Sequence, residues 1–477
     1  MPTFATERAH AGGGLRRGCT YDRLLPALLF IALFVAAALM PIQHDTWWQL
    51  RAGHDMWATR RVLLIDTYSH TAYGAFWPNH EWLAEVFYYA CYRVGGLALV
   101  TLFAATLIAI AWSITWRLTT GSLRLRFALT ALALVPASLH WEPRPHAFSF
   151  LFLMLTVYLI VRERYAWLPL VFLIWANCHG GVLTGFLVLT TGLSVQMLWS
   201  RDGWLRRSTT LAACAIAGTA TPLGLALWSE LPKSLARIRM YPLNEWQPAT
   251  FTDPRLAPFW LIAALLCVCV VRRLIHARAE KWSKPQSMSA VTMTACALVL
   301  LPLAISAVRN VGLFLMIAVP AITALVPAAA GSPASRRERT WLNLTIIAAA
   351  TAASIAAIVY AYVMQIDHLR WTPLPAGSLR ALARCPGNLY NRYDEGGYLI
   401  WFAPEKPVFL DGRQDPYEPR LILEQIRIES TGDYAGAFSQ YHIGCAYLPT
   451  SSPVAARLAT AGWRSLYRDP NWVVLAR

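Results

Sequence analysis

The chain alternates long apolar segments with short polar loops. Segments of roughly 20 apolar residues are long enough to cross the hydrocarbon core of a bilayer as helices. Such segments, some of them shorter, lie at 24–42, 96–116, 127–140, 147–161, 166–177, 182–199, 209–228, 258–271, 289–306, 311–328 and 341–363. A water-soluble fold would have to hide all of them in one core. The pattern therefore predicts an all-α, multi-pass membrane domain over 24–364 with about eleven crossings of a lipid bilayer.

The loops between these segments differ in charge. Basic residues gather on every second loop: Arg117, Arg124 and Arg126; Arg162 and Arg164; Arg201, Arg206 and Arg207; the 272–284 loop; and Arg336, Arg337 and Arg339. Since Lys and Arg are enriched in cytoplasmic loops, we expect a cytoplasmic tail over 1–23 and an extracytoplasmic C-terminus, in a bacterial plasma (inner) membrane. The net charge of +16 then reflects orientation. No basic, aromatic-interleaved module is present, so nucleic acid is not an expected partner.

Two polar regions fall on the expected outer side. The first outer loop, 43–95, ends in "HEWLAEVFYYACYRV", whose apolar spacing predicts an interfacial helix. The last region, 365–477, predicts a small extracytoplasmic α/β domain. Strands are expected at "GNLYNRY", "KPVFLDGR", "IGCAYLP", "GWRSLYRD" and "NWVVLAR", and helices at "PRLILEQIRIES" and "SPVAARLATAG". Outside the membrane, Cys385 and Cys445 of this domain can form a disulfide.

The stretch "HDTWWQLRAGHDMW", His44 to Trp57, crowds acids, imidazoles and indoles directly after the first apolar segment. One interpretation is interfacial, because Trp residues favour the headgroup region and a loop carboxylate there is solvated. The other is functional. Asp45 could act as a general base on an acceptor hydroxyl, while Trp47 and Trp48 offer flat apolar walls for a sugar or a prenyl chain.

An acid directly after the first span, followed by "DTWWQLRAG", "DTYSHT" and "WPNHEWLAE", resembles the polytopic glycosyltransferases of the GT-C class. Their relatives include the protein O-mannosyltransferases and the lipid A aminoarabinose transferases. The resemblance implies transfer, with inversion, of a sugar from a polyprenyl-phosphate donor to a lipid, glycan or protein acceptor at the outer face, with Asp45 as the catalytic base. Many members carry an Asp-Glu pair here, whereas Thr46 follows Asp45, so Asp55 and Glu81 stay as rival bases.

A second resemblance lies in "NRYDEGGYLIWFAPEKPVFLDGR". It is similar to the acceptor-recognition stretch Trp-Trp-Asp-Tyr-Gly of oligosaccharyltransferase catalytic subunits. Tyr393, Asp394 and Gly396 match the second Trp, the Asp and the Gly, whereas Arg392 and Glu395 depart from the motif. The resemblance implies that Asp394 contacts the acceptor; the alternative is a polar turn before a helix.

A prenyl phosphate that leaves develops negative charge, which a preformed cation would stabilise. Arg309 is the first candidate, because with Asn310 it interrupts the apolar stretch 289–328 on the outer side. Arg144 in "HWEPRPH" is the second. Both could instead be headgroup or loop charges.

Other outer polar residues leave alternatives open. Histidines and acids are numerous enough to hold a possible divalent cation: His44, His54, His80, His146 and His179 with Asp45 and Glu81. Each could equally be a hydrogen-bonding or solvated residue. His179 lies in the short hairpin "NCHGG" and would point toward the same cavity. Glu245, in the 229–257 loop, could pair with a cation or the acceptor, or be solvated.

The sequence thus predicts a membrane glycosyltransferase, with two alternatives. A lipid or sugar transporter would place ionisable residues within the spans, along a pathway. A non-enzymatic envelope assembly protein would need the C-terminal domain but not Asp45.

Overall fold

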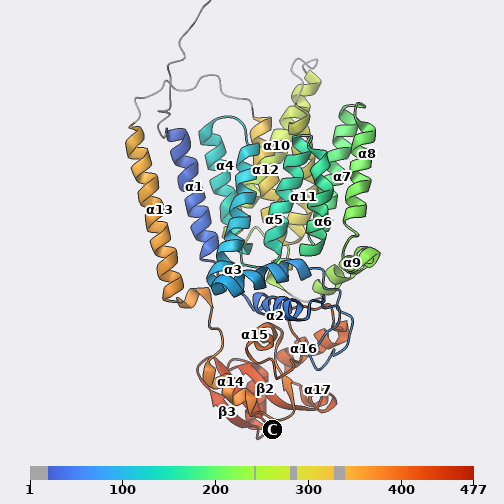
Figure 1. Cartoon of the computed structure of the whole chain (residues 1–477), viewed down its shortest axis with the longest axis vertical. Coiled ribbons are helices and arrows are strands. Elements are labelled where there is room, and N and C mark those ends of the chain that lie inside the picture. Colours follow the sequence, from blue (N-terminus) through green and yellow to red (C-terminus); the bar gives the residue numbers. More distant parts are fainter. Residues whose placement is uncertain (1–19, 241–242, 280–286, 327–338) are drawn as a thin grey trace, which may run out of the picture.

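The computed structural model describes residues 20–240, 243–279, 287–326 and 339–477. Most of the expected tail 1–23 and parts of two basic loops, 280–286 and 327–338, lie outside these residues. The described part forms a helical bundle with a smaller domain at one end (Figure 1).

Each predicted apolar segment corresponds to a helix of the bundle. In the described part these helices are α1 (Tyr21–Ala38), α3 (Trp82–Leu118), α4 (Leu123–Ala137), α5 (His146–Val161), α6 (Leu168–Cys178), α7 (Val182–Trp199), α8 (Trp204–Ala217), α10 (Ala257–Ala279), α11 (Met288–Ser306), α12 (Val311–Leu325) and α13 (Thr340–Val363). Eight of the described helices are long and apolar enough to cross a membrane, whereas α5 and α6 are shorter apolar helices and α8 has 14 residues. The protein is therefore a multi-pass membrane protein, and eight of the about eleven expected spans have the length and composition that a crossing requires.

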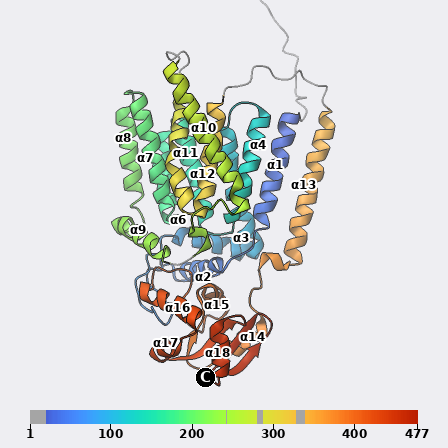
Figure 2. The same ribbon diagram turned by 180° about the vertical axis from the view of Figure 1, so that it is seen from behind.

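Two helical segments lie across one end of the bundle (Figures 1 and 2). Part of the expected first outer loop, for which no secondary structure was predicted, forms α2 (His44–Thr59). The expected interfacial helix is confirmed as the first part of α3, which bends at Gly95 and Gly96 before it enters the bundle. Gly96 has a φ of 59°, which glycine adopts without steric cost. A short helix, α9 (Leu227–Ile238), lies at the same end of the bundle.

The C-terminal domain is a small α/β domain with a four-stranded sheet of order β1-β2-β4-β3. Its strands are β1 (Asn388–Tyr390), β2 (Ile443–Pro449), β3 (Arg464–Arg468) and β4 (Trp472–Ala476); β1 runs parallel to β2 and the other pairs are antiparallel. Its helices are α14 (Ala376–Ala383), α15 (Tyr393–Phe402), α16 (Pro419–Thr431), α17 (Ala435–Gln440) and α18 (Pro453–Thr460). Both expected helices and four of the five expected strands are confirmed. The expected disulfide between Cys385 and Cys445 is present, with the two Cα atoms 5.5 Å apart.

The strand expected at "KPVFLDGR" is wrong. Val408 forms an isolated parallel bridge with Ser69 of the first loop, not with the sheet. The Val408 N–H donates to the Tyr68 carbonyl at 3.0 Å, and the His70 N–H donates to the Val408 carbonyl at 3.1 Å. This segment therefore joins the C-terminal domain to the first loop.

Glycines let the C-terminal domain approach α2 closely. A Cβ added to Gly397, on α15, would lie 2.2 Å from the backbone oxygen of His44. A Cβ added to Gly412 would lie 2.2 Å from Oδ1 of Asp45. Real Cβ atoms do not approach other atoms this closely. At Gly397 the nearest atom belongs to the backbone, so the observed packing requires glycine, whereas at Gly412 a Cβ would displace the end of the Asp45 side chain.

Candidate functional site

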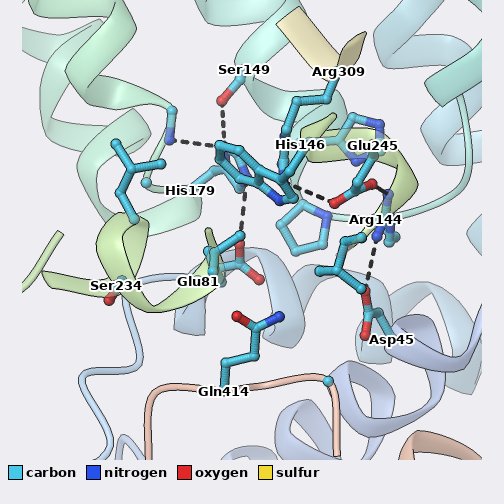
Figure 3. A pocket seen from close by; sticks show the side chains of 18 of the residues that line it. Asp45, Glu81, Arg144, His146, Ser149, His179, Ser234, Glu245, Arg309 and Gln414 are labelled. Atoms are coloured by element: carbon cyan, nitrogen blue, oxygen red, sulfur yellow. Dashed lines mark hydrogen bonds and ion pairs between the residues drawn. The ribbon is translucent and has the colours of Figure 1, made fainter. Parts of the chain in front are cut away.

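A cavity of about 520 Å³ lies between the end of the bundle and the C-terminal domain (Figure 3). One part of its wall is apolar and is formed by Phe150, Leu183, Leu231, Leu235, Ile238, Leu303 and Leu313. The other part is polar. From the expected site residues, the cavity brings together Asp45, Trp48, His80, Glu81, Arg144, His146, His179, Glu245, Arg309 and Asn310.

Asp45 lies in the first turn of α2, where the helix dipole favours a negative charge. Its Oδ2 forms an ion pair with Nη1 of Arg144 at 2.8 Å. Its Oδ1 accepts a hydrogen bond from Nε1 of Trp48 at 3.1 Å and lies 3.3 Å from Nε2 of His44. The neighbouring hydroxyl of Thr46 donates to the carbonyl of Pro143 at 2.9 Å and joins α2 to the Arg144 segment. These contacts hold the carboxylate in one orientation at the cavity wall.

Arg144, Glu245 and Arg309 continue the chain of charges that begins at Asp45. Nη2 of Arg144 lies 2.7 Å from Oε2 of Glu245, and Nη1 of Arg309 lies 3.0 Å from Oε1 of the same carboxylate. The Arg309 guanidinium also lies over the Trp246 ring, 4.4 Å from its centroid. Burial alone would raise the pKa of Glu245, but Arg144 and Arg309 outweigh burial and hold that pKa well below its usual value. Glu245 is therefore ionised and bridges two cations.

Glu81 belongs to a second polar chain in the cavity. Nε2 of His179 lies 3.4 Å from its Oε1, and Gln49 donates to its Oε2 at 3.2 Å. Nδ1 of His179 accepts from the Gly181 N–H at 3.0 Å and lies 2.7 Å from the Ser149 hydroxyl. Nδ1 is thus an acceptor in the neutral ring, and Nε2 carries the proton that faces Glu81.

Burial determines the protonation of Glu81 and His179. It raises the pKa of Glu81, with His80 acting in the opposite direction. It lowers the pKa of His179 well below its usual value, and nearby Arg309 lowers that pKa further. A neutral His179 therefore faces a carboxyl group that takes up a proton more readily than an exposed glutamate does.

Three expected site residues do not line this cavity. Trp47 is 2% exposed and packs on Trp401 and Phe402, with ring centroids 6.0 and 4.6 Å away. Asp55 pairs with Arg51 at 2.9 Å and accepts from Tyr68 at 2.9 Å, beside a separate small cavity. Asp394 is largely exposed, and its nearest cavity partner is His44, at 3.9 Å.

Two more expected residues meet the backbone of neighbouring elements. His146 begins α5, and its Nε2 lies 2.6 Å from the His140 carbonyl. The Asn310 side chain donates to the Leu303 carbonyl at 3.1 Å, which also accepts from the backbone N–H of Ala307 at the end of α11. Both residues line the cavity next to Arg309 or Arg144 without an ion pair of their own.

The sequence analysis did not identify several polar residues of the wall. Glu142 accepts from Gln43 at 2.7 Å, and burial raises the pKa of its carboxyl group. Gln414 and Asp415 reach the cavity from the C-terminal domain. The signal for the last two was the polar run "DGRQD", directly after the apolar "VFL".

Arg413 holds the polar segment 411–415 in place through contacts inside the protein. Its side chain is fully buried and pairs with Asp66 and Asp411, both at 2.6 Å. Its guanidinium group also lies over the rings of Trp77 and Tyr68, 4.8 and 5.0 Å from their centroids. The turn is thereby held rigidly against the first loop.

Within the described residues, no group of three or more His, Cys, Asp or Glu side chains is arranged to hold a metal ion. The possible divalent cation stays a prediction.

Neither a protein-family model nor a curated protein matches the chain. Solved structures do. The archaeal oligosaccharyltransferase AglB from Archaeoglobus fulgidus, in complex with an inhibitory peptide and a dolichol-phosphate, is 10% identical, with a TM-score of 0.56 over 89% of this chain and 69% of that one. The apo oligosaccharyltransferase from the same organism is 12% identical, with a TM-score of 0.53 over 90% and 70%. ArnT from Cupriavidus metallidurans, in the apo state, is 14% identical, with a TM-score of 0.49 over 95% and 97%.

The two oligosaccharyltransferase structures establish the fold at this level of identity. They align with about nine tenths of this chain, across both the membrane bundle and the C-terminal domain. The chain therefore has the fold of the GT-C glycosyltransferases.

Proposed function

We propose that the protein is a membrane glycosyltransferase that moves a sugar from a polyprenyl-phosphate carrier to an acceptor on the outer face of the membrane. One observation carries the proposal: a carboxylate and two guanidinium groups, Asp45, Arg144 and Arg309, line one cavity that also has an apolar part to its wall. The likeness in fold to an oligosaccharyltransferase bound to dolichol-phosphate supports the same kind of donor.

Asp45 would act as the general base. Its carboxylate would take the proton of an acceptor hydroxyl while that oxygen attacks the anomeric carbon of the sugar. The bond from the anomeric carbon to the phosphate oxygen would break at the same time, and the polyprenyl phosphate would leave with the electron pair. A single displacement of this kind inverts the anomeric configuration.

Arg144 and Arg309 would stabilise the leaving phosphate. A guanidinium group is planar and donates two parallel hydrogen bonds to phosphate oxygens. Burial alone would lower the pKa of Arg144, but Glu245, Glu142 and Asp45 outweigh it, so this pKa is raised well above its usual value. Arg144 therefore stays charged throughout the reaction, as a preformed electrostatic catalyst must.

The apolar wall would take the lipid end of the donor. Leu231, Leu235 and Ile238 project from α9 into the cavity, and Leu183 from α7 faces it too. A prenyl chain next to these side chains would be removed from water at roughly 25 cal/mol per Å² of apolar surface.

We assign the cavity to the extracytoplasmic side of a bacterial plasma membrane, with the N-terminus in the cytoplasm, because the basic loops mark the opposite end of the bundle. The acceptor would be a lipid, a glycan or a protein that reaches the cavity from that side.

The test uses the purified full-length protein, radiolabelled polyprenyl-phosphate sugars and a membrane extract as the source of acceptors. Asp45→Asn should lower the transfer rate by about 10²- to 10⁴-fold, the range for loss of a general base. Asp55→Asn, on the same helix but outside the cavity, should keep the rate. Equal thermal unfolding midpoints would show that both variants fold.

Two results would contradict the proposal. Transfer that survives in Asp45→Asn but disappears in Asp55→Asn would move the base to the rival residue. No transfer from any donor by the folded wild-type protein would favour the assembly protein or the transporter.

A further inference from the structure

The cavity wall opposite Arg309 carries hydrogen-bond acceptors that the chain itself does not use. Among the described residues, Oε1 of Gln414, Oδ1 of Asp415 and Oε1 of Gln49 are buried and accept no hydrogen bond of standard geometry. The three residues are only 3%, 7% and 3% exposed. Buried polar atoms in native proteins are normally paired, because an unpaired one loses its hydrogen bond to water without replacement. Three unpaired acceptors on one cavity wall therefore indicate a ligand that brings donors.

The orientation of Gln414 follows from its neighbours. Its Nε2 donates to the Tyr393 hydroxyl oxygen at 2.6 Å, and that hydroxyl donates to the Gly412 carbonyl at 3.2 Å. The amide nitrogen is thus used inside the C-terminal domain, which turns Oε1 toward the cavity. Figure 3 shows Gln414 pointing into the cavity from below, between Glu81 and Asp45.

The backbone at Gln414 is also unusual. Its φ of 61° lies in the left-handed region, which L residues other than Asn and Asp seldom adopt. Such conformations cost free energy and persist where the surrounding structure imposes them, frequently at ligand sites. The surrounding structure here is the buried Arg413 with its two ion pairs, one residue earlier.

Asp415 is held from the other side by α9. Nη1 of Arg237 donates to the Asp415 backbone carbonyl at 2.8 Å, while the same nitrogen lies 3.8 Å from the side-chain Oδ1, beyond hydrogen-bond reach. Burial raises the pKa of the Asp415 carboxyl, against opposing effects from His80, Ser234 and Arg237. Arg237 and Ser234 therefore hold the Asp415 carboxyl group at the cavity wall, where a ligand can meet it.

The three acceptors adjoin the proposed base. Gln49 follows Asp45 by one turn of α2, so both side chains lie on the same face of that helix. Gly412, two residues before Gln414, touches the Asp45 carboxylate. A group bound by these acceptors would therefore lie next to the reacting centre.

We propose that Gln414, Asp415 and Gln49 form a hydroxyl-recognition subsite that binds a polyhydroxylated sugar ring through the hydrogens of its hydroxyl groups. This deepens the proposed function, on which it rests, by assigning the recognition of the sugar ring to the "RQD" turn of the C-terminal domain. The ring belongs either to the transferred sugar or to a glycan acceptor. The transferred sugar and a glycan acceptor both carry several hydroxyl groups that can donate hydrogen bonds.

Binding is tested first, without any reaction. The full-length protein in lipid nanodiscs is examined by saturation-transfer NMR with methyl glycosides of glucose, mannose, galactose and arabinose. The matched probe is 2-methoxytetrahydropyran, which has the same ring without the hydroxyl groups. At least one glycoside should bind the wild-type protein, and the hydroxyl-free ring should not.

The variants are chosen to preserve the fold. Gln414→Met keeps an unbranched L side chain of similar length at the strained position, and Asp415→Leu keeps the branched shape of the side chain but removes both acceptor oxygens. Each should weaken glycoside binding by about three- to tenfold, the loss that corresponds to one hydrogen bond. Gln440→Met, on the exposed end of α17, should bind like the wild type. Binding that is unchanged in both test variants, or equal binding of the hydroxyl-free ring, overturns the subsite.

A transfer assay then separates the two sources and the two proposals. A rise in KM for the donor assigns the subsite to the transferred sugar, and a rise in KM for the acceptor assigns it to a glycan acceptor. Transfer that needs Asp45 but has wild-type KM values in both variants overturns the subsite and leaves the enzyme standing. Glycoside binding that needs Gln414, in a protein without any transfer, keeps the subsite and removes the enzyme.

Discussion

Replacing Gly412 by alanine tests whether the C-terminal domain holds the Asp45 carboxylate in position. The added Cβ would lie 2.2 Å from Oδ1 of Asp45, 3.3 Å from its Cγ and 3.4 Å from Nε1 of Trp48. The φ of Gly412 lies outside the left-handed region, so alanine meets no backbone strain there. The whole effect of the substitution is therefore the contact with Asp45 and its hydrogen-bond partner.

The size of the effect follows from the overlap. Real Cβ atoms stay at least 3.0 Å from other heavy atoms, so the carboxylate or the turn must move by about 1 Å. A displacement of about 1 Å in a catalytic group can lower the rate by roughly 100-fold, or about 2.7 kcal/mol in activation free energy. Asp45 cannot rotate away freely, because Arg144 and Trp48 hold its two oxygens. We expect kcat to fall by about two orders of magnitude.

The assay compares Gly412→Ala with Gly436→Ala in the radiolabel transfer reaction. Gly436 lies in the same domain, and a Cβ there would meet nothing within 4 Å. Gly436→Ala should keep the wild-type kcat, and both variants should show wild-type thermal unfolding of the C-terminal domain. A wild-type kcat in Gly412→Ala would refute the reasoning, since the carboxylate would then need no fixed position.

Three further predictions concern pH, covalent structure and the phosphate partner. The pKa of His179 is lowered in the folded protein from the ordinary 6.5. Its contribution to stability is therefore complete above pH 6.5 and is lost progressively as the pH falls from 6.5 toward the lower pKa of the folded state, so His179→Gln should remove up to about 1.4 kcal/mol per pH unit of that slope. Unfolding at pH 5 and pH 7.5 measures the slope, and an unchanged slope would contradict the prediction. Replacing both Cys385 and Cys445 by serine should destabilise the C-terminal domain by about 2–4 kcal/mol in denaturant unfolding. The reason is that the disulfide closes a loop with a sequence separation of 60. An unchanged unfolding midpoint would contradict this prediction. Arg309→Lys keeps the charge but loses the planar pair of N–H groups that bind a phosphate. KM for the polyprenyl-phosphate sugar should therefore rise about tenfold. A KM within error of the wild type would exclude Arg309 as the phosphate partner.

The membrane bundle could be predicted from the sequence because its signal is local. The length and apolar character of each segment are set by the thickness of the bilayer, whatever the segment packs against. Helix α2 lacks this signal. Its buried residues include Thr46 and Gln49 as well as Trp47 and Leu50, because polar partners from the 140–146 segment and Glu81 cover part of it.

Long-range pairing explains the failure at "KPVFLDGR". Its consecutive apolar residues Val408 to Leu410 favour a strand, but the partner is Ser69, more than 300 positions earlier in the chain. Nothing within the segment distinguishes a bridge to a distant loop from membership of the nearby sheet. The same limit applies to Gln414 and Asp415, whose unpaired oxygens become informative only when the opposite wall of the cavity is known.

Ten of the expected site residues line the cavity, Trp47, Asp55 and Asp394 do not, and the arrangement of the site was not predicted. Arg309 and Arg144 stood out because each is an isolated cation between apolar segments on the less basic side. Both arginines pair with the same carboxylate, that of Glu245. The sequence does not reveal this pairing, because whole helices separate positions 144, 245 and 309.

The division of contacts on Arg144 shows how the same charges can serve both stability and catalysis. Asp45 and Glu245 together balance Arg144 and Arg309, so the chain neutralises its own buried cations, which would otherwise be costly. Arg144 uses Nη1 for Asp45 and Nη2 for Glu245. A phosphate that replaces Glu245 between the two guanidinium groups would therefore leave the contact between Arg144 and Asp45 intact. Since Asp45 would keep its charge and position during this exchange, donor binding and activation of the acceptor can proceed at neighbouring atoms of one arginine.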